Sequence, residues 1–152
     1  MKRISRIVVL TLVLAMALSA SAFAAMSAGD LVAEAKGKIT QISPMELQMR
    51  LEMGEKLLVI DIRNKEEFLA GHIPGAVNVT RDLLEFKIAD LVPDPETEFV
   101  VNCKSGGRSS LAAEQLVRMG YTNVLNLDGG MKAWMQSGYP VETALGLFTL
   151  AQ

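Results

Sequence analysis

The chain of 152 residues contains only one cysteine, Cys103, and only one histidine, His72. A lone cysteine cannot form an internal disulfide, and one cysteine with one histidine is too few for a typical zinc site. Basic residues are fewer than acidic ones, 15 against 17. The chain therefore lacks the basic excess that neutralises phosphates, which argues against nucleic acid as a partner. A small anionic substrate stays compatible, because a local site can be positive on an acidic protein. We expect no metal and no other cofactor.

The amino terminus has the layout of a secretory signal peptide. Three basic residues precede a charge-free apolar run at 7–18, and the small residues that follow place Ala22 and Ala24 at the spacing of a cleavage site. We predict cleavage after Ala24 and export to the periplasm. The alternative is a membrane anchor, because residues 7–28 could provide the about 20 residues that span a bilayer.

The mature chain is predicted to be one domain. Removal of residues 1–24 leaves 12 basic and 17 acidic residues, a net charge of −5. The remaining length suits a single domain. We assign residues 25–38 to a linker or short helix, 39–141 to the domain, and 142–152 to an apolar tail without an assigned structure.

Predicted strands and helices alternate along the domain. The predicted strands are 38–43, 57–62, 76–80, 98–102 and 123–127. The predicted helices are 43–54, 65–71, 82–92, 108–120 and 129–138. This order indicates an α/β fold with a mostly parallel sheet of about five strands and helices on both faces. Met45, Met49 and Met53 recur every four residues in the first of these helices, and we interpret them as core packing.

The segment NCKSGGRSS at 102–110 joins the fourth strand to a helix. Ligands of open parallel sheets lie beyond the carboxyl ends of the strands, where Cys103 falls. Gly106 and Gly107 allow the loop to turn several N–H groups inward, and the helix adds its own unpaired N–H groups and its positive dipole end. Such a nest binds anions and favours a thiolate, a nucleophile that needs no base. We expect Cys103 to be exposed, because small polar residues surround it.

Three segments together resemble the rhodanese family. CKSGGRS at 103–109 is similar to its active-site loop, and DIRNKEEFLAGHIPGAVNV at 61–79 resembles its strand, short helix and G-H-I-P-G-A turn. LDGGMKAW at 127–134 resembles its closing motif. The segments follow the expected order over about residues 40–140. The resemblance implies a rhodanese-like fold and a sulfurtransferase that uses a small anionic donor such as thiosulfate and a thiophilic acceptor such as cyanide or a thiol.

The resemblance also implies roles for the loop residues. Cys103 matches the nucleophile that carries the sulfur as a persulfide. Arg108 matches the main side-chain contact to the substrate anion, since a guanidinium can bind two oxygens at once. Lys104 stands where many relatives have arginine, which puts the strength of thiosulfate binding in question. The other substrate-binding residues of this cradle are Ser105, Gly106, Gly107 and Ser109.

Residues outside the loop are interpreted as supporting it. Asp61 and Arg63 are expected to hold the loop ends, with Glu67 as the partner of Arg63. His72 could activate a thiol, as in cysteine hydrolases, but its place in the G-H-I-P-G-A turn favours a structural role. The DGG at 128–130 is interpreted as a turn with a capping aspartate.

Alternative functions remain open at this point. The domain could bind a partner or carry sulfur to one without catalysis, or Cys103 could be a redox-sensing thiol that oxidises to sulfenic acid. Phosphatase activity is disfavoured because Cys103 to Arg108 spans six residues, one fewer than the loop of related tyrosine-phosphatase-like enzymes.

Overall fold

The computed structural model describes residues 25–149, so the predicted signal peptide and residues 150–152 of the predicted tail lie outside the described residues. The described part contains a five-stranded sheet in the order β1-β5-β4-β2-β3 with every strand pair parallel. Its strands are β1 (Thr40–Ile42), β2 (Leu58–Asp61), β3 (Val77–Asn78), β4 (Phe99–Asn102) and β5 (Val124–Leu127). The predicted parallel α/β sheet is thus confirmed.

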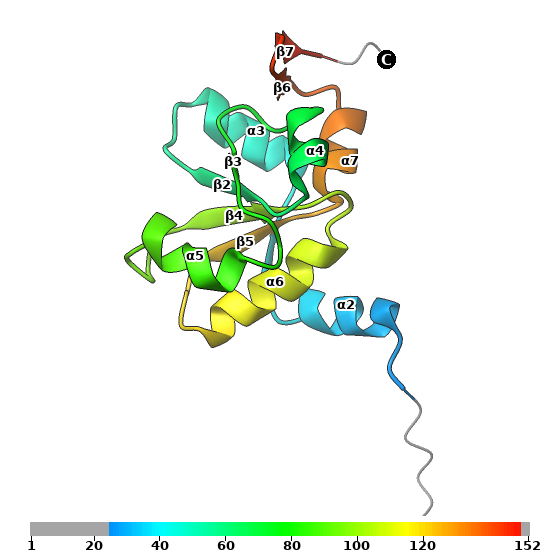
Figure 1. The fold of residues 1–152 in the computed structure, drawn as a ribbon, viewed down its shortest axis with the longest axis vertical. Helices are drawn as coiled ribbons and strands as arrows, with labels where there is room; N and C mark the ends of the chain where they lie inside the picture. Colours follow the sequence, from blue (N-terminus) through cyan, green and yellow to red (C-terminus); the bar gives the residue numbers. More distant parts are fainter. Residues whose placement is uncertain (1–24, 150–152) are drawn as a thin grey trace, which may run out of the picture.

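Helices cover both faces of the sheet. They are α2 (Ala28–Lys36), α3 (Pro44–Glu52), α4 (Lys65–Leu69), α5 (Leu84–Leu91), α6 (Gly107–Arg118) and α7 (Gly130–Gln136). In Figure 1, α3, α4 and α7 lie above the strands, and α2, α5 and α6 lie below them. Two buried apolar clusters correspond to these two layers, one around Leu84, Ile88 and Leu116 and the other around Leu47 and Trp134.

Local sequence signals explain where the first helices begin. The Ser43 hydroxyl accepts a hydrogen bond from the Glu46 N–H at 3.1 Å, and Pro44 occupies the first helical position of α3. The Asn64 side chain accepts from the Glu67 N–H at 2.7 Å, which completes a capping box at α4. The segment predicted as a linker or short helix forms α2.

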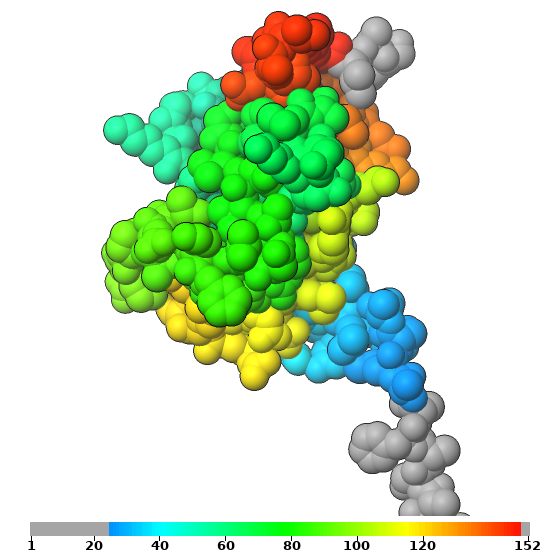
Figure 2. Space-filling view, in the orientation of Figure 1, coloured from blue at the N-terminus to red at the C-terminus, as the bar shows by residue number. Residues whose placement is uncertain are grey.

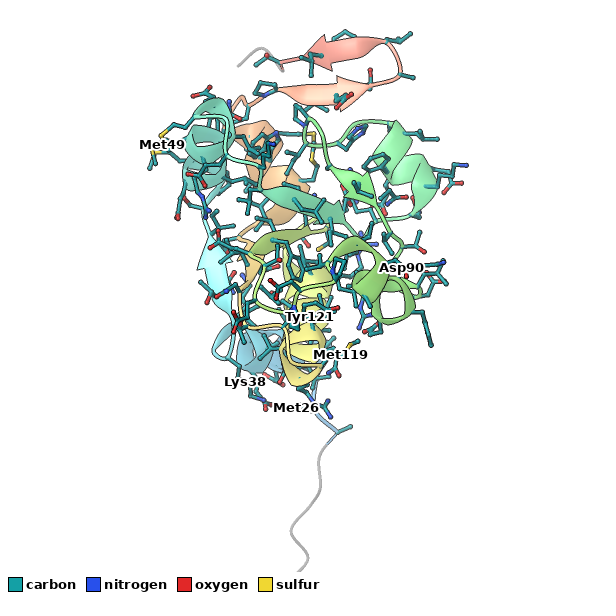
Figure 3. The ribbon with its side chains drawn as sticks, turned by 90° about the vertical axis from the view of Figure 1, so that its left-hand side faces the viewer. Met26, Lys38, Met49, Asp90, Met119 and Tyr121 are labelled. Atoms are coloured by element: carbon teal, nitrogen blue, oxygen red, sulfur yellow. The ribbon has the colours of Figure 1, made fainter. Side chains whose placement is uncertain are left out.

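The methionine stripe of α3 was wrongly assigned to the core. The exposed fractions of Met45, Met49 and Met53 are 69%, 52% and 65%, whereas Leu47 on the same helix is fully buried. Figure 3 shows Met49 on the outer side of α3, away from the sheet. The four-residue spacing identified one face of the helix correctly, but only tertiary packing decides which face turns inward.

The tail, which the sequence left without an assigned structure, starts in a hairpin. β6 (Val141–Thr143) pairs antiparallel with β7 (Gly146–Phe148). The hairpin is attached to the turn after α4 because the backbones of His72 and Glu142 exchange hydrogen bonds of 3.0 and 2.8 Å. Figure 2 shows these last residues, in red, seated against the green segment that contains α4. Among residues 25–149, no helix has the length and apolar character needed to cross a membrane.

Candidate active site

Cys103 follows β4 directly, at the carboxyl edge of the sheet between β5 and β2. Gly106 takes a left-handed conformation, φ 84°, and is the residue from which α6 starts. The carbonyls of Cys103 and Lys104 accept hydrogen bonds from the N–H groups of Met131 and Lys132 at 2.8 and 2.9 Å. The first turn of α7 therefore holds the loop through two of the loop's carbonyl groups. The N–H groups of the loop take no part in this contact and stay available to a ligand.

The sulfur of Cys103 receives hydrogen bonds from Ser109. The Ser109 N–H lies 3.4 Å and its hydroxyl 3.3 Å from Sγ. Within residues 25–149, none of the backbone N–H groups of residues 104–108 donates to an acceptor. The loop thus holds a sulfur at the start of a helix, where unpaired N–H groups and the helix dipole favour negative charge. An anion added to this loop would find donors that no protein group occupies.

The expectation that Cys103 is exposed was wrong. The residue is fully buried and belongs to the apolar cluster below the sheet, together with Ile62, Ala112 and Ala113. The loop was expected to leave the thiol open because its residues are small and polar. Instead, the loop closes over the sulfur: the buried Ser109 contacts it, and the Ser109 hydroxyl also contacts the carbonyl of the buried Gly106.

Three other predicted loop contacts, Lys104, Ser105 and Arg108, are exposed. The Arg108 guanidinium contacts both carboxylate oxygens of Glu67, each at 3.4 Å. This is a long pairing for two charged groups that normally meet at about 2.7–2.9 Å. Arg108 therefore stands at the rim of the loop in a loose ion pair that another anion could replace.

Asp61 and Arg63 form a buried ion pair with each other and contact no residue of the cysteine loop beyond Asn102. We call it the closed pair, because its members bond to protein groups rather than to an incoming ligand. Arg63 Nε donates to both Asp61 oxygens at 3.0 and 2.9 Å, and Nη2 donates to Oδ2 at 2.7 Å and to the Gly71 carbonyl at 2.7 Å. The Asn102 side chain, one residue before Cys103, donates to Asp61 at 3.2 Å. The prediction that Glu67 pairs with Arg63 was wrong, because the Asp61 carboxylate already accepts the hydrogen bonds of the Arg63 guanidinium.

His72 makes its contacts with α4 and with the β6–β7 hairpin rather than with the cysteine loop. Its Nδ1 lies 2.9 Å from the Phe68 carbonyl, its Nε2 lies 3.7 Å from the Glu142 carboxylate, and its ring stacks on Phe68. Both ring nitrogens are thus directed at groups other than Cys103. Among residues 25–149, no three His, Cys, Asp or Glu side chains are grouped closely enough to hold a metal ion.

Gly130 supports the loop in a way that the sequence did not reveal. Its φ is 58°, and a Cβ at this position would lie 2.5 Å from the Cys103 carbonyl and 2.9 Å from the Ser105 nitrogen. Any side chain would displace the loop, so the close approach requires glycine. The paired glycines Gly129 and Gly130 in the closing motif were the one feature of the sequence that pointed to this close approach.

Asp128, expected to cap α7, has a different partner. The helix has Gly129 as its N-cap residue and no side-chain cap. The Asp128 carboxylate lies 2.7 Å from Lys36 Nζ of α2, and this hydrogen bond lowers its pKa below the ordinary value. The pair ties α2 to the turn that supports the cysteine loop.

Comparisons with known proteins agree with the resemblance of the sequence motifs. The model of the rhodanese-like domain family matches residues 43–137. The chain is 35% identical over 103 residues to a sulfurtransferase of Allochromatium vinosum, covering 68% of this chain and 94% of that protein. It is 38% identical over 105 residues to the thiosulfate sulfurtransferase GlpE of Pseudomonas putida, covering 68% and 91%.

Solved structures give the same fold. A rhodanese-related protein of Thermoplasma volcanium superposes with a TM-score of 0.60 at 28% identity, over 68% of this chain and 97% of that one. A protein of unknown function from Rhodopseudomonas palustris, described as a possible tyrosine phosphatase, gives 0.73 at 29% identity, over 78% and 96%.

Proposed function

The chain belongs to the rhodanese family, and we propose that it transfers sulfane sulfur through a persulfide on Cys103. Membership in this family and the similarity to sulfurtransferases support sulfur transfer in general. The observation that carries the specific proposal is the geometry of the loop, in which Ser109 donates to the Cys103 sulfur and the following N–H groups at 104–108 have no acceptor within residues 25–149.

Thiosulfate is the proposed donor. The Cys103 thiolate attacks the outer sulfur, the S–S bond of thiosulfate breaks, and sulfite leaves with the electron pair. Arg108 binds the sulfonate oxygens in place of Glu67, whose contacts of 3.4 Å are weak enough for a better placed anion to displace. Because Cys103 is buried, the donor reaches it only when the loop opens locally.

The second half of the reaction returns the thiolate. The persulfide Cys–S–S⁻ presents its outer sulfur to cyanide or to a thiol, the S–S bond breaks, and its electron pair returns to Cys103. The loop amides stabilise the outer sulfur while it is anionic, in the same way that they stabilise other anions.

Intact-protein mass spectrometry tests this proposal directly. After incubation with thiosulfate, the wild-type protein should gain the mass of one sulfur atom, and cyanide should remove it and release thiocyanate. Cys103→Ser should gain nothing while keeping its fold by circular dichroism. A wild-type protein that stays unmodified at saturating thiosulfate would contradict the proposal, and the non-catalytic and redox-sensing alternatives would then take its place.

A phosphatase function is the second candidate, because the structural neighbour from Rhodopseudomonas palustris carries that description. The six-residue span from Cys103 to Arg108 makes a tighter ring than a seven-residue phosphate loop. We therefore expect no turnover of p-nitrophenyl phosphate above that of Cys103→Ser. Turnover that requires Cys103 would favour the phosphatase.

We further propose that residues 1–24 direct export to the periplasm and are cleaved after Ala24. The basic start, the apolar run and the small-residue site support this. Mass measurement of the protein recovered from its native host should give a chain that starts at Ala25 in the periplasmic fraction. A full-length chain in the membrane fraction would support the anchor at residues 7–28 instead.

A further inference from the structure

A cavity of about 460 Å³ lies between α4, α7 and the β6–β7 hairpin. Its apolar wall includes Ala70, Met135, Val141 and Phe148, and its polar side includes Arg63 and Glu67. The volume is within the range of small-molecule sites, which are largely apolar with a few placed polar groups. Val141 and Phe148 lie beyond residues 43–137, so the hairpin adds a wall that the family match does not cover.

The cavity adjoins the cysteine loop through Glu67. This side chain lines the cavity, and its carboxylate also contacts Arg108 at the rim of the loop. A molecule held in the cavity would therefore lie next to the ion pair that we expect the sulfur donor to open. The position suits the second substrate of the reaction better than a site of unrelated function.

Arg63 provides the polar group that would orient a ligand in this cavity. Only 6% of this residue is exposed, and Nε and Nη2 are fully engaged by Asp61 and the Gly71 carbonyl. Its third nitrogen, Nη1, donates to no group within residues 25–149. A guanidinium N–H without an acceptor is a strong donor, and it belongs to a side chain that lines the cavity.

The charges on the wall define what can bind. Asp61 balances Arg63, and Arg108 balances Glu67, so the charged side chains of the lining leave little net charge. Thr143 and Thr149 also line the cavity, and Arg63 Nη1 is the donor that comes from a buried, charged side chain. An apolar arm would pack against Val141 and Phe148, and a single oxygen acceptor on that arm would bind Arg63 Nη1. A highly charged anion such as thiosulfate has no apolar part to place there.

We propose that this cavity binds the sulfur acceptor, and that the acceptor is a low-molecular-weight thiol with an apolar arm ending in a carboxylate or amide oxygen. The proposal rests on the proposed sulfur transfer through Cys103. The thiolate R–S⁻ attacks the outer sulfur of Cys–S–S⁻, the S–S bond breaks, and its electron pair stays on Cys103. The products are the persulfide R–S–S⁻ and the Cys103 thiolate, so atoms and charge balance without another reactant.

The test separates loading from discharge. The full protein is loaded with thiosulfate, freed of excess donor and mixed with cyanide, thioglycolate, mercaptohexanoate or mercaptohexanol, and loss of the extra sulfur is followed by mass spectrometry. Rates are expressed per thiolate and relative to a free low-molecular-weight persulfide. We expect mercaptohexanoate to discharge Cys103 about tenfold faster than thioglycolate, because its four additional methylenes leave water. Mercaptohexanol should be at least threefold slower than mercaptohexanoate, because it lacks the charged acceptor for Arg63.

Two pairs of variants place this preference in the cavity. Ala70→Trp fills the cavity from the exposed residue that caps the end of α4, and Leu69→Trp adds the same bulk one residue away, at a position that does not line it. Phe148→Ala removes part of the wall, whereas Leu147→Ala changes the neighbouring residue outside it. Ala70→Trp and Phe148→Ala should each reduce the tenfold preference to less than threefold, and the two controls should keep it.

The outcomes separate the two proposals. If no persulfide forms, sulfur transfer through Cys103 is wrong. If the persulfide forms and cyanide discharges it, but the long and short thiols react equally in wild-type protein, the cavity proposal is wrong and sulfur transfer stands. A preference that survives both Ala70→Trp and Phe148→Ala would equally overturn the cavity as the acceptor site.

Discussion

Asp61 at the end of β2 and Cys103 just after the end of β4 are buried polar groups on neighbouring strands, and they differ in how completely they are paired. The Asp61 carboxylate accepts from Arg63 and Asn102, and its partner guanidinium also reaches the Gly71 carbonyl. Around Cys103, by contrast, five consecutive backbone N–H groups at 104–108 have no acceptor within residues 25–149.

The difference separates structure from function. Burying a polar group costs free energy unless it is hydrogen-bonded, so the fold needs the pair at Asp61 to stay complete. The N–H groups of the cysteine loop have no acceptor in the protein, so an anion can bind there without breaking a hydrogen bond of the fold. Substitutions in the closed pair should therefore reduce stability, and substitutions in the open loop should reduce activity.

The largest effect is expected from Asp61→Ala. The substitution leaves the guanidinium of Arg63 buried without its counter-charge, which costs about 3–5 kcal/mol of unfolding free energy when a buried pair is broken. Urea denaturation followed by circular dichroism measures the change. The double variant Asp61→Leu with Arg63→Met should recover much of the loss, because it removes both charges. A loss below 1 kcal/mol for Asp61→Ala would show that the pair is not the structural support described above.

Gly130→Ala is expected to affect both properties. An alanine at φ 58° costs about 1–2 kcal/mol, and its Cβ would lie 2.5 Å from the Cys103 carbonyl, so the loop must shift. We expect about 2–3 kcal/mol of lost stability and at least a tenfold fall in sulfur transfer.

Gly54→Ala is the matched control for that variant. Gly54 also has a positive φ, 79°, but a Cβ there meets nothing within 4 Å. It should lose about 1–2 kcal/mol from backbone strain alone and keep full activity. Equal losses of activity in the two variants would mean that strain, rather than contact with the loop, explains the result.

Arg108→Ala is expected to act on activity alone. The side chain is exposed at the rim and its pairing with Glu67 is long, so stability should change by less than about 0.5 kcal/mol. Loss of a charge-assisted contact to the donor should reduce kcat/KM for thiosulfate about 10- to 100-fold. Arg118→Ala, at the exposed end of the same helix, should leave kcat/KM unchanged. If the Arg108→Ala variant were stable and fully active, Arg108 would not be a contact to the sulfur donor.

The sequence predicted those parts of the molecule that local patterns determine. Ser43, Pro44 and Asn64 start helices through contacts within a few residues, and β4 is an apolar run that only a covered sheet accommodates. The loop was found for the same reason, because its glycines and the helix after it are contiguous. Alternation of these elements was then enough for the parallel sheet.

What the sequence missed depends on contacts between distant segments. Cys103 is buried because the loop closes over it and the far-off α7 holds the loop, through Gly130 and two backbone hydrogen bonds. Glu67 pairs with Arg108, 41 residues away, because Asp61 already occupies Arg63. The hairpin itself pairs neighbouring residues of the tail, but its attachment to the domain depends on the backbone of His72, far earlier in the chain. No local pattern contains these distances.

The smallest effect is expected at the exposed ion pair of Lys36 and Asp128, which contrasts with the buried pair of Asp61 and Arg63. The hydrogen bond from Lys36 lowers the pKa of Asp128 in the folded state. A lowered folded pKa stabilises the protein above the unfolded value of 3.8, and this contribution disappears as the pH falls through the folded pKa. Because more than half of the Asp128 side chain is exposed, solvent screening limits the contribution at pH 7 to about 0.5 kcal/mol.

Asp128→Asn isolates this contribution when its unfolding free energy is compared with that of the wild type at several pH values. The variant should be less stable by about 0.5 kcal/mol at pH 7, and the difference should vanish once the pH is below the folded pKa of Asp128. At pH 7 it should also shrink in 1 M salt, where screening is strong, whereas the cost of Asp61→Ala should hardly change because that pair is buried. If salt weakened both pairs equally, burial would not distinguish them, and the contrast between closed interior pairs and open surface ones would need another cause.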